Sequence, residues 1–237
     1  MKLQQLLRYG IPIFFAFVVT ALVPAARATL INSSLLNSGF ESPVIGKKTY
    51  SIMNESSVPG WDTTATDHMI EIWSTGFNGV SAYEGNQFAE LDANQQATLF
   101  EDVSGIAANM KLDFSFAHRG RAAVESMRFT ITDLGADGLM GTKDDTTLFS
   151  KIYSDGTSAW GYYTSASEKQ ILSTGNTIRV SFDSLTPGSV GNFLDAVDLN
   201  VAAGAPEPGT WATLLLLSFA SCGPAVLRGI RRPVAGC

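Results

Sequence analysis

Cysteine and histidine are scarce in this 237-residue chain, and their positions restrict the chemistry available to it. Cys222 and Cys237 both lie near the C-terminus, so residues 29–203 form no disulfide and hold no thiolate nucleophile. The only two histidines, His68 and His118, are too few for a histidine-rich metal site. The G-x-S-x-G motif of serine hydrolases is also absent. The composition therefore favours a binding or structural protein over an enzyme.

Basic residues are also few once the two ends of the chain are set aside. Six of the 16 Lys and Arg lie before residue 29 or after residue 203, whereas only one of the 22 Asp and Glu does. Residues 29–203 therefore carry a net charge of −11, compared with −6 for the whole chain. So negative a segment repels polyanions, which argues against nucleic acid as a partner and favours cations and neutral ligands such as sugars.

The first 28 residues have the organisation of a secretory signal peptide. A positively charged start is followed by an apolar run over residues 11–23 and then by Ala26-Arg27-Ala28. We predict export through the inner membrane, with cleavage by signal peptidase after Ala28. The alternative is an uncleaved N-terminal anchor, although the run is short for a membrane span and contains Pro12.

The other end of the chain, residues 204–237, combines a Pro-Glu-Pro motif, an apolar stretch and a basic terminus. The apolar stretch at about residues 211–227 is just long enough for a membrane-spanning helix. By the positive-inside rule, the arginines that follow it would stay in the cytoplasm. The motif and the basic terminus consist of Pro206, Glu207, Pro208, Arg228, Arg231 and Arg232.

This order and spacing resemble the PEP-CTERM sorting signal, which is typical of Gram-negative bacteria that make exopolysaccharide. The resemblance covers residues 204–232 and implies an exosortase, a membrane-embedded cysteine protease, as the processing partner. It also implies transient anchoring in the inner membrane, followed by transfer to the cell surface or the extracellular space. A plain C-terminal membrane anchor is the alternative.

Residues 29–203 are expected to form one domain made of strands. Short alternating or β-rich runs are separated by clusters of Gly, Asn, Asp, Ser and Pro, and no segment keeps a 3.6-residue period. Leu112, Phe114 and Phe116, for example, place apolar groups on one face at period two. This spacing predicts an all-β fold, an antiparallel β-sandwich or jelly roll. Strands are expected at residues 88–91, 97–103, 110–118, 126–132, 147–153, 160–164, 177–182 and 193–201.

Several segments of the domain resemble the galactose-binding-like jelly rolls, a superfamily that includes many carbohydrate-binding modules. The segments follow the family's order over residues 35–201. They are Leu36 to Glu41, Val58 to Trp61, Glu84 to Leu91, Phe100 to Val103, Leu112 to Phe116 and Phe193 to Leu199. The resemblance implies a jelly-roll fold, and a fold alone leaves the ligand open.

The same resemblance implies a structural calcium site. In related jelly rolls the acid of the first strand and the first Asp of the last strand bind one Ca²⁺, and the matching residues here are Glu41 and Asp195. Calcium takes hard oxygen ligands, and a bound ion would tie together the two ends of a disulfide-free domain. Ala196 stands where many relatives have a second Asp, which removes one ligand. The alternative is two solvated acids at strand ends.

The Asp- and Gly-rich segment 133–145 is a second candidate calcium site. Alternation of Asp and Gly lets a loop turn its carboxylates and carbonyls inward, as in the calcium loops of extracellular repeats, although the spacing is not that of an EF-hand. An ordinary hairpin loop is the alternative. The side-chain ligands would be Asp133, Asp137, Asp144 and Asp145.

A carbohydrate-binding face is the third candidate site. Sugar recognition combines aromatic rings, which stack on C–H faces, with polar groups that bond hydroxyls. The rings would come from Trp73, Trp160, Tyr162 and Tyr163, and the polar groups from Glu71, His118, Arg119 and Arg121. The alternative is that the tryptophans belong to the core and the arginines pair with acids.

We therefore expect an exported, non-catalytic surface or matrix protein that binds carbohydrate, in particular exopolysaccharide. One alternative is a purely structural surface or biofilm protein without a specific ligand. Another is a glycoside hydrolase that uses paired acids such as Glu71 and Glu90. An aromatic row exposed on one sheet face would favour sugar binding, whereas burial of every Trp would favour the structural role.

Overall fold

A computed structural model describes residues 34–203 of the chain. The predicted signal peptide and the predicted sorting residues Pro206, Glu207, Pro208, Arg228, Arg231 and Arg232 lie outside the described residues. None of the helices within residues 34–203 is both long enough and apolar enough to cross a membrane.

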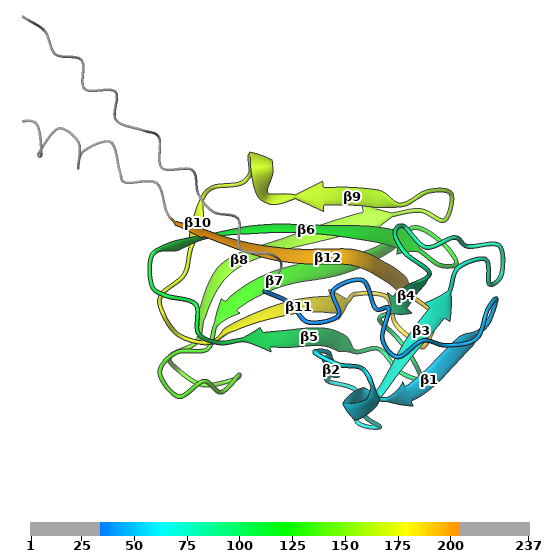
Figure 1. The fold of residues 1–237 in the computed structure, drawn as a ribbon, viewed down its shortest axis with the longest axis horizontal. Helices are drawn as coiled ribbons and strands as arrows, with labels where there is room; N and C mark the ends of the chain where they lie inside the picture. The colour runs from blue at the N-terminus through cyan, green and yellow to red at the C-terminus, as the bar shows by residue number, and fades with distance from the viewer. Residues whose placement is uncertain (1–33, 204–237) are drawn as a thin grey trace, which may run out of the picture.

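Twelve strands of the described segment form two antiparallel sheets that pack face to face (Figure 1). Sheet A has the order β1-β3-β4-β12-β6-β10, and β9 also pairs with β6. Sheet B has the order β2-β5-β11-β7-β8. The strands of sheet A are β1 (Tyr50–Asn54), β3 (Met69–Ser74), β4 (Gln87–Glu90), β6 (Met110–Gly120), β9 (Gly161–Thr164), β10 (Ile171–Leu172) and β12 (Asn192–Ala203). Those of sheet B are β2 (Asp62–Thr63), β5 (Thr98–Val103), β7 (Glu125–Asp133), β8 (Thr146–Asp155) and β11 (Ile178–Ser184).

The all-β sandwich that the sequence predicts is confirmed. Each of the eight expected strands is present, as β4 to β9, β11 and β12. The four strands without a prediction are β1, β2, β3 and β10. Two of these have only two residues each, too few to show a period. In β3 the polar residue Glu71 is buried although it lies on the outer face of the sheet. The strand therefore lacks the usual alternation of exposed polar and buried apolar residues.

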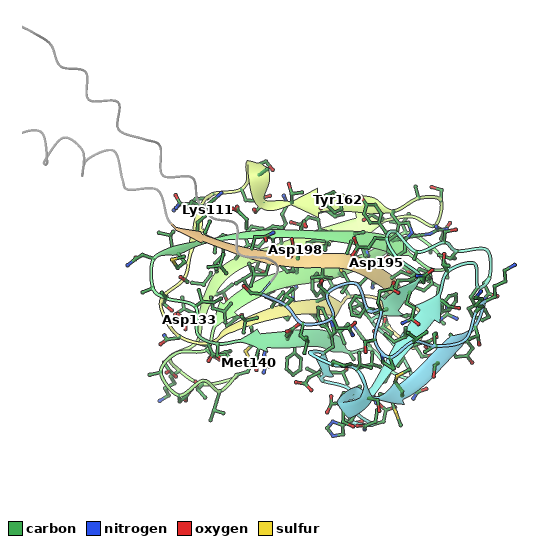
Figure 2. The ribbon with its side chains drawn as sticks, in the orientation of Figure 1. Lys111, Asp133, Met140, Tyr162, Asp195 and Asp198 are labelled. Atoms are coloured by element: carbon green, nitrogen blue, oxygen red, sulfur yellow. The ribbon has the colours of Figure 1, made fainter. Side chains whose placement is uncertain are left out.

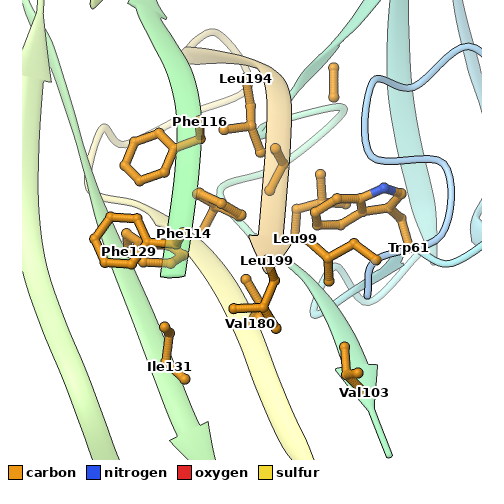
Figure 3. Close-up of a cluster of buried hydrophobic side chains, with 14 of the residues drawn as sticks. Trp61, Leu99, Val103, Phe114, Phe116, Phe129, Ile131, Val180, Leu194 and Leu199 are labelled. Carbon is orange, nitrogen blue, oxygen red and sulfur yellow. The ribbon is translucent and has the colours of Figure 1, made fainter. Parts of the chain in front are cut away.

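Aromatic and aliphatic side chains from both sheets fill the space between them (Figure 3). Leu112, Phe114 and Phe116 of β6 all point into this core, as their alternation predicts. Phe116 is at the centre, and its ring lies 5.0 Å from that of Phe129 and 5.3 Å from that of Phe182, both in sheet B. Burial of such rings is the main source of stability in a domain without disulfides.

A β-bulge in β12 changes which of its residues face the core. The pairing of β12 with β6 shifts between Asp195 and Asp198, and Ala196 within the bulge has a φ of 49°. Leu194 before the bulge and Val197 within it are both buried in the core, which one uninterrupted alternation would not allow. The bulge leaves the carboxylate of Asp195 on the outer side of sheet A, where it is fully buried.

Candidate functional site

An aromatic row crosses the outer face of sheet A. Cross-strand pairing sets Tyr50 opposite Trp73, Trp73 opposite Phe88, and Ala117 opposite Tyr162. Opposite residues of antiparallel strands project from the same face, so these side chains share one side of the sheet. The row cannot be recognised in the sequence, because its rings come from four separate strands, β1, β3, β4 and β9.

The connection from β3 to β4, residues 75–86, folds over the outer face and is called the strap here. Phe77, Val80 and Ala82 of the strap pack against a small hydrophobic cluster. The buried members of that cluster are Trp73, Phe88 and Phe193. The strap thus covers the middle of the aromatic row and leaves the Trp73 side chain only 2% exposed.

The row reaches solvent beside β9, where Tyr83 of the strap stacks on Tyr162. Their ring centroids are 5.3 Å apart and their planes differ by 6°, and the residues are 43% and 50% exposed. We call these two residues the tyrosine pair. Trp160 lies next to it, with its ring 6.3 Å from that of Tyr83, and its Nε1–H donates to the carbonyl of Ser81 at 2.9 Å. Figure 2 shows Tyr162 at the outer edge of the sandwich.

Sequence reasoning named Trp160 and Tyr162 and missed Tyr83, which lies in a loop without alternation. It also named three side chains that the structure buries: Trp73, Glu71 and His118, the last of them at 0% exposure. These three offer no free surface to a sugar in this conformation. Tyr163 is partly buried, and its ring packs against Phe116 of the core.

Glu71 and Glu90 lie side by side on the outer face at paired positions of β3 and β4. Trp73 Nε1–H donates to Glu71 Oε1 at 2.6 Å, and Arg121 Nη1 donates to the two carboxylate oxygens of Glu90 at 2.6 and 2.5 Å. Burial raises the pKa of Glu90 to about 8 and also raises that of Glu71. A glycosidase pair must flank a bond in an open cleft, whereas these two residues are only 3% and 1% exposed.

The two arginines of the 118–121 turn have different surroundings. Arg121 is committed to Glu90, and its guanidinium lies 4.8 Å from the ring centroid of Trp73. Arg119 donates to the carbonyl of Thr157 and, unlike the other arginines of residues 34–203, forms no ion pair with an acid. Arg119 is also directly opposite Phe193 on the outer face, one strand away from β9. Of the two, Arg119 is the one with hydrogen-bonding capacity left for a ligand.

His118 belongs to a buried polar chain that joins strands of both sheets. Its Nε2 is 2.7 Å from Asn192 Oδ1 and its Nδ1 is 2.7 Å from Asp155 Oδ2. Asn192 donates to Ser184 Oγ at 3.1 Å, and Ser184 in turn donates to Asp92 at 2.5 Å. Every member has a partner, so the role the geometry supports for His118 is to hold the sandwich together at this end.

The predicted calcium ligands Glu41 and Asp195 do come together, because both bind the backbone at the end of the strap. Asp195 Oδ2 accepts the N–H groups of Tyr83 and Glu84 at 2.7 and 3.1 Å. Glu41 Oε1 accepts those of Asn86 and Gln87 at 2.6 and 2.9 Å. Burial raises the pKa of Asp195 to about 7. Two N–H donors bond to each of these oxygens.

The predicted calcium loop 133–145 lies at the opposite end of the sandwich from Tyr162 and Asp195 (Figure 2). Its carboxylates bond within the loop and to its neighbours. Asp133 accepts from Thr174 and Asn176, Asp144 from Ala136, Asp137 from Leu139 and Asp145 from Gly141. Throughout residues 34–203, no three His, Cys, Asp or Glu side chains are grouped so that they could hold a metal ion.

Calcium binding is tested by melting. Calcium added to chelator-treated protein is expected to raise the Tm, because an ion that binds only the folded state stabilises it by about 2.7 kcal/mol at 100 times its Kd. Asp144→Asn and Asp195→Asn separate the two predicted sites, since the substitution that abolishes the rise marks the site. Identical melting curves with calcium and with chelator would remove both.

The described residues thus define an antiparallel β-sandwich of the jelly-roll kind with a partly exposed aromatic row on its outer face. No known protein family and no curated protein sequence matches the chain significantly. Among solved structures, the Stig cyclase Fisc from Fischerella sp. TAU, in complex with (3Z)-3-(1-methyl-2-pyrrolidinylidene)-3H-indole, is 16% identical with a TM-score of 0.54 and covers 75% of this chain and 100% of its own. A cyclase from Fischerella sp. TAU in complex with 4-(1H-indol-3-yl)butan-2-one is also 16% identical, with a TM-score of 0.52 and coverages of 74% and 100%.

A carbohydrate-binding module also aligns with the chain. TmCBM61, in complex with β-1,4-galactotriose, is 14% identical with a TM-score of 0.45 and covers 71% of this chain and 98% of its own. At 16% identity, the similarity to the two cyclases shows that this chain shares their fold. A common fold hosts many functions, so the ligand of this chain has to be argued from its own site.

Proposed function

We propose that this protein is an exported, non-catalytic carbohydrate-binding protein whose site is the tyrosine pair together with Trp160 and Arg119. The observation that carries the proposal is the stacked pair itself. Tyr83 and Tyr162 are large, half-exposed rings held parallel on the outer face of a sheet, next to an arginine without an acid partner. Exposed rings in a fixed orientation suit the flat C–H faces of a pyranose.

A neutral glycan is the ligand class that agrees with the charge of the domain. The net charge of −11 over residues 29–203 repels acidic polysaccharides at long range. Arg119 is then expected to donate hydrogen bonds from its planar guanidinium to sugar hydroxyls, and not to a sugar carboxylate. We further propose delivery by the signal peptide and by exosortase processing of the 204–237 tail, which would bring the domain to an exopolysaccharide outside the cell.

Alanine substitutions in the tyrosine pair are expected to weaken glycan binding. Tyr162→Ala and Tyr83→Ala should each raise the Kd at least about tenfold, equivalent to about 1.4 kcal/mol, because each removes one stacking ring. Arg119→Ala should have a smaller effect of the same sign. A glycan array of neutral and acidic polysaccharides would find the ligand, and calorimetry would then measure each Kd.

Tyr50→Ala is the matched control, because Tyr50 is a tyrosine of similar exposure, 48%, at the other end of the aromatic row. Its Kd should equal that of the wild type. An equal loss in Tyr50→Ala would contradict the site. No binding to any glycan by the wild type, with or without calcium, would favour the alternative of a purely structural surface protein.

A further inference from the structure

The end of the strap is held by two carboxylates that come from distant parts of the chain. Asp195 in the β12 bulge binds the N–H groups of Tyr83 and Glu84, and Glu41 binds those of Asn86 and Gln87. The four distances are between 2.6 and 3.1 Å, so four backbone donors, two on each side of Gly85, point at two carboxylates. Hydrogen bonds to an ionised acceptor are roughly twice as strong as neutral ones.

This arrangement depends on a close approach that only glycine permits. Gly85, between the two pairs of donors, has a φ of +57°, and a Cβ at this position would lie 2.2 Å from Glu41 Oε1. Any other residue would displace the carboxylate, because a contact under 3.0 Å is sterically forbidden. A glycine at position 85 therefore lets the Glu41 carboxylate reach the backbone of this segment.

The remaining ties of the strap near the tyrosine pair are weaker. Trp160 Nε1–H donates to the carbonyl of Ser81, and the N–H of Ala82 donates to Thr75 Oγ1 at 3.0 Å. Both are neutral bonds, and neither reaches the backbone of Tyr83. Of these bonds, the one that holds the backbone of Tyr83 directly is that from its own N–H to Asp195, while packing of Phe77, Val80 and Ala82 holds the rest of the strap.

We propose that Asp195 and Glu41 are positioning residues of the sugar site: an anionic clamp that holds the strap so that Tyr83 stacks on Tyr162. This inference rests on the function proposed above. The clamp as proposed works without a cation, because backbone N–H groups bond to both oxygens of Asp195 and to Oε1 of Glu41. If Glu41 and Asp195 form this clamp, they are not calcium ligands, and the 133–145 loop is the remaining candidate calcium site. A preorganised ring binds more tightly, because its ordering cost is met before the ligand arrives.

The test compares amide hydrogen exchange in the full-length protein and in Asp195→Asn and Glu41→Gln, without any sugar. Both substitutions keep the shape of the side chain and remove its charge. We expect exchange of the 83–87 amides to rise at least tenfold in each variant, while exchange in the core strands β7 and β11 stays as in the wild type. Asp198→Asn is the matched control, since Asp198 is on the same strand and its carboxylate binds Asn200, not the strap.

Two results would overturn the clamp. One is exchange at residues 83–87 that is unchanged in both variants, or raised equally in Asp198→Asn. The other is loss of wild-type protection at these amides on adding a chelator, which would assign the role to a bound cation. The glycan Kd is measured separately and should rise about tenfold in Asp195→Asn. Because the exchange experiment contains no sugar, a wild type that binds no glycan refutes the proposed function without changing the exchange result.

Discussion

Arg121→Ala is expected to lower the free energy of unfolding by about 3 kcal/mol or more, because it removes one partner of a buried ion pair. Glu90 is 1% exposed, and Arg121 Nη1 bonds to both of its oxygens. Of its hydrogen-bond partners, Glu90 would keep only the N–H of Gly191, at 3.0 Å. The substitution also removes the guanidinium that lies over the ring of Trp73, a residue that the strap covers.

Urea unfolding at pH 9 measures this effect, because the pKa of Glu90 is about 8 and its carboxyl is mainly ionised only above that pH. Arg128→Ala is the control, because Arg128 pairs with Asp183 at 3.3 Å on the exposed surface, where such a pair contributes about 0 to 1 kcal/mol. Losses of similar size in the two variants would show that burial of Glu90 adds nothing. A double substitution, Arg121→Met with Glu90→Leu, should recover part of the lost stability, because it leaves no uncompensated buried charge.

The second large effect is a fall in stability as the pH rises from about 5 to 8. Burial raises the folded-state pKa of Glu90 to about 8, of Glu101 to about 7 and of Asp92 to about 6, all well above their ordinary values. The folded state therefore binds more protons than the unfolded state in this range. The stabilisation is complete below the unfolded pKa values and is lost as the pH passes each folded value. Each titrating group contributes about 1.4 kcal/mol per pH unit.

Urea unfolding at pH 5, 6.5 and 8 checks the direction. Glu101→Gln should flatten the curve between pH 5 and 7, because it replaces the charged form with a neutral side chain of the same shape. Glu101 is a sensitive choice, since Oε1 accepts the N–H of Leu36 at 2.8 Å whereas Oε2 is buried without a hydrogen-bond partner. A stability that stays constant or increases from pH 5 to 8 would contradict the prediction.

The strands and the core were largely readable from the sequence, because their signal is local. Leu112, Phe114 and Phe116 alternate along one strand, and that pattern alone assigns their side. The bulge in β12 was not readable. Whether Leu194 and Val197 both face inward depends on how β12 pairs with β6, which involves residues about 80 positions apart.

The site was predicted only in part, because solvent exposure is a property of the folded chain. Trp73 and Tyr162 are equally good sugar platforms as residues, yet the strap covers the first and leaves the second exposed. Arg119 and Arg121 are two positions apart, and only the position of Glu90 makes one a structural residue. Tyr83 had no sequence signal, since it reaches Tyr162 through a loop held by Asp195.

What the amino-acid sequence determined by itself was the class of fold, the acidic charge of the domain and its lack of cysteine. These follow from composition and from short-range periodicity, which need no partner elsewhere in the chain. Only the tertiary structure decided which rings remain in solvent and that Glu41 and Asp195 meet on one segment. Both depend on contacts between distant residues, which arise when the strap folds over sheet A.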